Sequence, residues 1–144
     1  MVNSQDSKIM TMLAPVSANG AAFTTIALDT VQSGVKADWA TVYVYFGAVG
    51  ANITAGNFKL TESDVDSGYA DVAGTTALTV TGTTDNGKVW AFQLDTRKRK
   101  RFIKLALTAG AGATLAAAWG ELSRQKEAPY TAATRGVTGA EIIL

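Results

Sequence analysis

The chain contains neither cysteine nor histidine. Without cysteine it can form no disulfide and no thiolate metal site, and it has no thiol nucleophile. Without histidine it lacks the commonest general base of enzymes and the commonest ligand of transition metals. Acid–base catalysis would have to rely on carboxylates, lysine or tyrosine. We therefore expect a protein that is not an enzyme and that needs no metal or other cofactor.

Long apolar runs are also missing. No segment approaches the roughly 20 apolar residues that a membrane-spanning helix needs, and the first six residues are polar rather than the apolar core of a signal peptide. We expect no membrane contact, and synthesis in a cytoplasm. The 144 residues are enough for one domain with a hydrophobic core of its own.

Positive charge is concentrated in one place. The chain has 13 basic and 12 acidic residues, a net charge of +1. Five of the basic residues are consecutive, so the rest of the chain has eight basic against 12 acidic residues, a balance of −4. The five residues of this basic run are Arg97, Lys98, Arg99, Lys100 and Arg101.

Apolar residues alternate with other residues on both sides of the basic run. Trp90, Phe92 and Leu94 alternate before it, and Ile103 begins a second alternating series after it. This period of two predicts β-strands with one buried face, so the basic run lies at a junction between two strands. The residues predicted to be buried on this parity are Val42, Val44, Trp90, Phe92, Ile103, Leu105 and Leu107.

Short strand-like segments separated by turn residues extend over most of the chain. Eight strands are predicted, at residues 8–15, 21–28, 39–46, 57–62, 76–81, 88–95, 99–108 and 113–122. Asn86-Gly87 lies between two of them and predicts a hairpin there. The pattern predicts an all-β fold, an eight-stranded β-sandwich, with a jelly roll favoured over an immunoglobulin-like arrangement.

The last 22 residues follow neither the helix period nor the strand period. We therefore divide the chain into a β-sandwich domain, residues 1–122, and an extended C-terminal arm, residues 123–144. The arm contains Tyr130 and ends in Ile142, Ile143 and Leu144, whose side chains should be buried. It either folds back on its own sheet or docks on a neighbouring subunit; our hypothesis is the second.

Three interpretations compete for the basic run. It is a solvated junction that keeps a sheet edge from pairing wrongly, a grip on an acidic protein surface, or a phosphate-binding site for nucleic acid. No aromatic stacking platform adjoins the run, which argues against nucleic acid. The residues that we single out as partner-binding are the basic run together with Tyr130, Ile142, Ile143 and Leu144.

Two further groups of residues have a functional and an ordinary interpretation. The carboxylates of residues 62–71 could bind calcium, but the spacing fails the EF-hand pattern, and Asp and Ser side chains also stabilise turns. The aromatic residues Trp39, Tyr43, Tyr45, Tyr69 and Tyr130 could form a sugar-binding platform, but aromatic residues are also common strand formers.

Residues 61–74, the Asn86-Gly87 pair and residues 94–107 together resemble a family of small proteins of tailed bacteriophages that are encoded beside the major capsid protein. The family pattern reads roughly "ESDDG…DVAG", then an aspartate, several basic residues, an aromatic, a hydrophobic, a basic residue and leucine. This chain departs from it by Val65 and Tyr69 in the acidic turn, and by a longer C-terminal tail.

The resemblance implies a capsid decoration, or cement, protein with a jelly-roll fold, located on the virion. Its partner would be the major capsid protein, and it would bind the outer shell as a homo-oligomer, a dimer or a trimer. The alternative is a carbohydrate- or receptor-binding module of a head or tail fibre. Direct contact with nucleic acid is the third interpretation, and we do not expect it.

Overall fold

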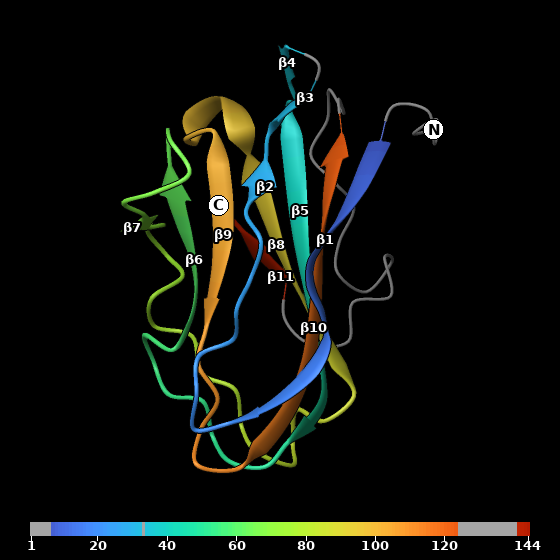
Figure 1. The fold of residues 1–144 in the computed structure, drawn as a ribbon, viewed down its shortest axis with the longest axis vertical. Coiled ribbons are helices and arrows are strands. Elements are labelled where there is room, and N and C mark those ends of the chain that lie inside the picture. Colours follow the sequence, from blue (N-terminus) through green and yellow to red (C-terminus); the bar gives the residue numbers. More distant parts are fainter. Residues whose placement is uncertain (1–6, 33, 124–140) are drawn as a thin grey trace.

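A computed structural model of the chain describes residues 7–32, 34–123 and 141–144. Two β-sheets pack face to face, so the predicted all-β sandwich is confirmed (Figure 1). In the described part of the chain the only helical element is a short 3-10 turn, η2 (Thr96–Lys98). The jelly-roll arrangement stays a prediction.

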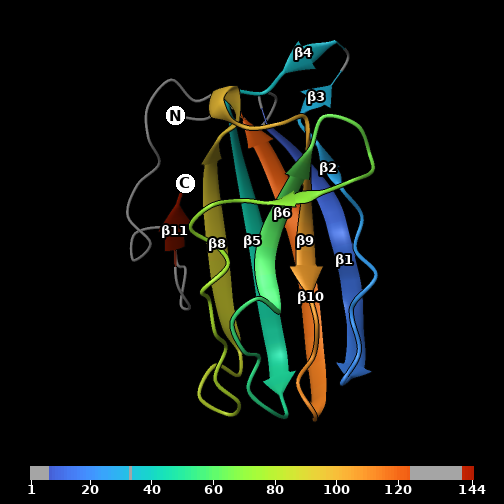
Figure 2. The same ribbon diagram turned by 90° about the vertical axis from the view of Figure 1, so that its left-hand side faces the viewer.

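The larger sheet has five strands in the order β1-β10-β5-β8-β11. It is antiparallel except that β11 pairs with β8 in parallel. Figure 2 shows the second sheet in front of it. The strands of the larger sheet are β1 (Ser7–Asn19), β10 (Ala113–Ser123), β5 (Trp39–Val49), β8 (Lys88–Asp95) and β11 (Glu141–Ile143).

The smaller sheet has four strands in the order β2-β9-β6-β7, and a separate two-stranded hairpin joins it to the larger sheet. The sheet strands are β2 (Leu28–Asp29), β9 (Phe102–Leu107), β6 (Phe58–Ser63) and β7 (Ala70–Asp71). The hairpin strands are β3 (Val31–Gln32) and β4 (Val35–Lys36), and they lie at the same end of the sandwich as η2 (Figure 1).

The hydrophobic core lies between the two sheets. All seven residues predicted to be buried are at most 9% exposed, so the predicted strand parity is confirmed. Phe58 lies at the centre, with its ring edge-on to those of Phe46, Trp90 and Phe92 at centroid distances of 5.3–5.5 Å. Such edge-to-face contacts add to the free energy gained by burial.

Two predicted strands are not formed. Residues 21–28 lie beside β9 and contact its chain only at isolated points. The Thr25 hydroxyl donates to the Leu105 carbonyl at 2.6 Å, and Ala22 forms a bridge to Thr108. Residues 76–81 make only one bridge, between Val80 and Ile53. Threonine hydroxyls can substitute for ladder hydrogen bonds, so a threonine-rich segment can lie against a sheet without becoming a strand.

The predicted hairpin at Asn86-Gly87 is also wrong. The turn exists, with Gly87 at φ 70°, but the segments before and after it do not pair with each other. Instead, Gly87 N–H donates to the Phe46 carbonyl at 2.7 Å, and Asn86 Oδ1 accepts from Val49 N–H at 2.7 Å. The turn is therefore fixed by β5, the antiparallel neighbour of β8 in the sheet.

Strand boundaries differ from the prediction in two places. β1 continues past Pro15 to Asn19, because it is an edge strand with register shifts on either side of Leu13, and proline is tolerated there. β9 begins at Phe102 rather than at Arg99, because the residues before it form η2 and the loop that follows it.

The last residues of the chain fold back on their own sheet. Glu141–Ile143 pair with Ala91, Phe92 and Gln93 of β8, and Leu144 N–H donates to the Gln93 carbonyl at 2.9 Å. Leu144 is partly buried and packs on the core. Residues 141–144 therefore fold back on their own sheet, whereas our hypothesis was that the C-terminal segment docks on a neighbouring subunit. The rest of the predicted arm, including Tyr130, lies outside the described residues.

Candidate functional site

The basic run lies at one end of the sandwich, on the connection from β8 to β9 (Figure 1). Asp95 caps η2 by accepting from the backbone N–H of Arg97 at 3.2 Å. Thr96 is fully buried, and its hydroxyl donates to the Ala37 carbonyl while its N–H donates to the Asp38 carbonyl at 3.1 Å. The run is therefore anchored to the segment that enters β5.

Two of the three arginines form bidentate ion pairs. Arg97 donates to both carboxylate oxygens of Asp95, at 2.8 and 3.0 Å. Arg101 does the same with Asp29, at 2.9 and 2.7 Å. The strand register brings Asp29 to this place, because it pairs with Phe102, the residue after Arg101. Such two-point contacts hold a guanidinium in one orientation.

The third arginine is the least exposed of the run. The side chain of Arg99 is 20% exposed, and its Nη1 lies 3.7 Å from Oε1 of Glu62. The second oxygen of Glu62 accepts from the backbone N–H of Lys100 at 3.2 Å. Lys36 adds a further tie, because its ammonium donates to the Arg99 carbonyl at 2.8 Å.

The two lysines of the run extend into solvent. Lys98 has a side chain that is 79% exposed, with its ammonium 3.9 Å from Asp95, a carboxylate that already binds Arg97. Lys100 is exposed, and among the described residues no carboxylate lies within 4 Å of its ammonium. Three carboxylates therefore offset three of five positive charges, and the excess lies on the two lysines.

These ion pairs shift the pKa values of the groups that form them. Hydrogen bonds from Arg101 lower the pKa of Asp29, and hydrogen bonds from Arg97 lower the pKa of Asp95. The same bonds raise the pKa of each arginine. Since the charged forms are the favoured ones, the pairs stay intact at neutral pH.

Acid should therefore remove the stability that these pairs contribute. A carboxyl with a lowered pKa stabilises the fold above its ordinary pKa and loses that contribution as the pH falls through its folded value. We expect the urea midpoint of the wild type to exceed that of Asp29→Asn at neutral pH, and the difference to vanish between about pH 5 and about pH 2. A difference that persists at low pH would show that Asp29 does not act through its charge.

The other predicted binding residues are only partly near the basic run. The Leu144 carbonyl lies 3.5 Å from the backbone N–H of Asp95, so the end of the chain reaches the base of η2. Ile142 and Ile143 belong to β11 and pair through their backbone with β8. Tyr130 lies outside the described residues.

The acidic turn is held by its own side chains. Ser63 Oγ donates to the Ser67 carbonyl at 2.6 Å, and the Tyr69 hydroxyl donates to Asp66. Desolvation, and then the contact with Asp66, raises the pKa of Tyr69 to about 12. Within residues 7–32, 34–123 and 141–144, no three acidic side chains are grouped as metal ligands. The turn explains these residues without a calcium ion.

The aromatic residues divide between the two sheets. Trp39, Tyr43 and Tyr45 alternate on the outer face of β5, whereas Tyr69 follows β6, where Lys104 lies over its ring at 5.3 Å. Tyr43 stacks on Trp119 of β10 at a centroid distance of 5.3 Å and an interplanar angle of 20°. Each ring therefore covers a face of the other, which leaves less flat aromatic surface for a sugar.

The sequence did not reveal the contacts that three residues make at these sites. Asp29 and Glu62 are 72 and 38 positions from the groups that they bind, and only the register of β2 and β6 against β9 places them there. Trp119 is the third, and the alternation of β10 is the signal that would place it on the outer face.

Comparison with known proteins gives no relative: no family model, no curated protein and no solved structure matches the chain. Within the described residues, no helix has the length and apolar character that crossing a membrane requires.

Proposed function

We propose that this chain is a structural virion protein that binds the outer capsid surface of a tailed double-stranded DNA phage and stabilises the head. The major capsid protein would be its partner, and the virion its location. The proposal starts from the resemblance of residues 61–74 and 94–107 to capsid decoration proteins. It is supported by a non-catalytic composition, since cysteine and histidine are absent from the sequence.

The observation that carries the proposal is the structure of the basic run. The three arginines of the run bind carboxylates of the same chain, while Lys98 and Lys100 extend outward from a rigid turn. Charges held on a rigid support guide encounter with an oppositely charged surface and fix the docking orientation. An acidic patch on the capsid is the complementary partner.

The internal pairs also determine which substitutions can test the proposal. Replacing Arg99 would leave Glu62, whose side chain is only 15% exposed, without an ion-pair partner. Replacing Arg97 or Arg101 would release Asp95 or Asp29. Such variants would change the fold as well as the surface. The two lysines can be replaced without breaking a close ion pair.

We expect the double variant Lys98→Gln/Lys100→Gln to bind undecorated heads about tenfold more weakly than the wild type, because two exposed charges contribute about 0.7 kcal/mol each. The wild type should also bind more weakly as salt is raised, since exposed charges are screened within about 8 Å. Co-sedimentation with purified heads measures both effects.

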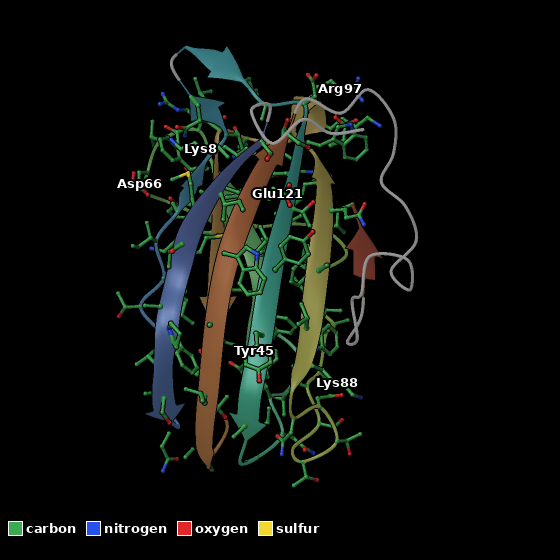
Figure 3. All side chains as sticks on the ribbon, turned by 90° about the vertical axis from the view of Figure 1, so that its right-hand side faces the viewer. Lys8, Tyr45, Asp66, Lys88, Arg97 and Glu121 are labelled. Carbon is green, nitrogen blue, oxygen red and sulfur yellow. The ribbon has the colours of Figure 1, made fainter. Side chains whose placement is uncertain are left out.

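The control variant is Lys59→Gln/Lys88→Gln, which removes the same charge from positions remote from η2 (Figure 3 shows Lys88 at the opposite end from Arg97). Because it also releases Asp71 and Asp85 from their ion pairs, thermal unfolding must show that this variant is folded. It should bind heads as the wild type does. An equal loss of affinity for heads in both double variants would mean that binding depends on net charge and not on the basic run. Unchanged binding of Lys98→Gln/Lys100→Gln would favour the interpretation of the basic run as a solvated junction without a partner.

A further inference from the structure

The outer face of the larger sheet carries exposed apolar and aromatic side chains. Figure 3 labels Tyr45 on this face. Ile9 is 68% exposed, Leu115 40% and Tyr45 37%, and the strand register places the Tyr43–Trp119 stack among them. The strand register places them on one surface, because β10 pairs with β1 on one side and with β5 on the other. Large apolar side chains grouped on an exposed sheet face mark an interaction surface.

The two faces of the sandwich differ in charge. Lys59 and Lys104 are outward residues of the smaller sheet, and Lys59 pairs with Asp71 at 2.8 Å. On the larger sheet, Glu121 lies at an outward position near the end of β10. The other outward positions of β10, and those of β5, are uncharged. An uncharged aromatic face offers no charge for an acidic or basic partner to pair with.

We propose that this face is the contact between two copies of the chain in a homodimer. A two-fold axis in the contact places the same patch on both sides, and an uncharged patch then brings no like charges together at its centre. The second copy would present the same aromatic side chains to the first. Tryptophan and tyrosine are among the residues that contribute most to binding energy in interfaces. This inference narrows the expected homo-oligomer to a dimer with a stated contact face, and it does not depend on binding to heads.

The geometry of the face suits such a contact. Three strands about 4.8 Å apart, each about ten residues long at about 3.4 Å per residue, give a surface of roughly 15 Å by 35 Å. With the relief of its side chains, this approaches the roughly 800 Å² per partner of an ordinary interface. The Tyr43–Trp119 stack also holds two of the large rings in place, so less conformational freedom is lost when the copies meet.

The test is sedimentation velocity of the complete chain, without heads, over a range of concentrations up to about 100 µM. We expect a species of twice the 15.0 kDa chain mass. Tyr45→Lys and Leu115→Lys place a charge in the contact and should each weaken dimerisation by about 30-fold or more. Val65→Lys is the matched control, since Val65 is 63% exposed and lies in the acidic turn beside the other sheet.

Two results would overturn the proposal. The first is a wild type that stays monomeric at the highest concentration. The second is a dimer that survives both Tyr45→Lys and Leu115→Lys with unchanged affinity. If such a dimer is lost when Glu141–Leu144 are deleted, the copies instead exchange the strand that pairs with β8. Thermal unfolding of each variant shows that it is folded.

Discussion

Phe58→Ala should lower the free energy of unfolding by about 3–5 kcal/mol. The Phe58 side chain is fully buried and contacts the rings of Phe46, Trp90 and Phe92, which come from the opposite sheet. Truncation removes the apolar contacts and leaves a cavity that three rigid rings cannot easily fill.

Urea unfolding monitored by circular dichroism measures this loss. Val65→Ala is the control, because Val65 is 63% exposed and its truncation should change stability by no more than about 0.5 kcal/mol. A loss below about 1 kcal/mol for Phe58→Ala would mean that Phe58 is not at the centre of the core.

Gly112→Ala should cost about 1–3 kcal/mol. The turn between β9 and β10 passes so close to the end of β5 that a Cβ at Gly112 would lie 2.6 Å from the carbonyl carbon of Gly50 and 2.8 Å from its oxygen. Both of these atoms are backbone, so no side-chain rotation can relieve the clash.

Gly47→Ala is the matched control for this close approach. Its Cβ would also come too close to a neighbour, at 2.9 Å, but the atom that it meets is Cδ2 of Leu115, a side chain that is 40% exposed and can turn away. We expect Gly47→Ala to be the milder change in urea unfolding. Equal losses would mean that the contact between the two backbone segments can open without cost.

The strands that could be predicted are those whose period of two is set by buried residues. β9 and β10 bury alternate side chains in the core, and β5 does so over most of its length, so the local sequence carries this parity. β8 keeps the alternation in its sequence, although residues 90–95 are buried on both faces. The segments that were predicted wrongly depend on partners. Residues 76–81 have a strand-like composition, but only Val80 forms a β-bridge, with Ile53.

The turn at Asn86-Gly87 shows the same limit. The dipeptide forms a turn, with positive φ at Gly87, but other parts of the chain determine which strands pair in the sheet. β8 pairs with β5 and β11, and not with the segment that precedes the turn. The residues of the turn therefore predict that the chain bends here, but they do not predict which strands pair.

The candidate site was predictable in position and not in its electrostatics. The run of five cations between two alternating segments placed it at the end of the sandwich. Its charge could not be judged from the run itself, because Asp29, Glu62 and Asp95 bind its three arginines, and two of these carboxylates come from distant strands. The outward charge is that of Lys98 and Lys100.

The measurement that tests the proposed function most directly is the copy number of this chain on purified heads of the phage that encodes it. Quantitative mass spectrometry against the major capsid protein gives the ratio, and a cryo-electron map of the same heads gives the position. We predict a fixed ratio that matches a class of lattice sites, with density for the sandwich on the outer surface of the shell. Heads that lack the chain, or a chain found only on tails or fibres, would contradict the proposal.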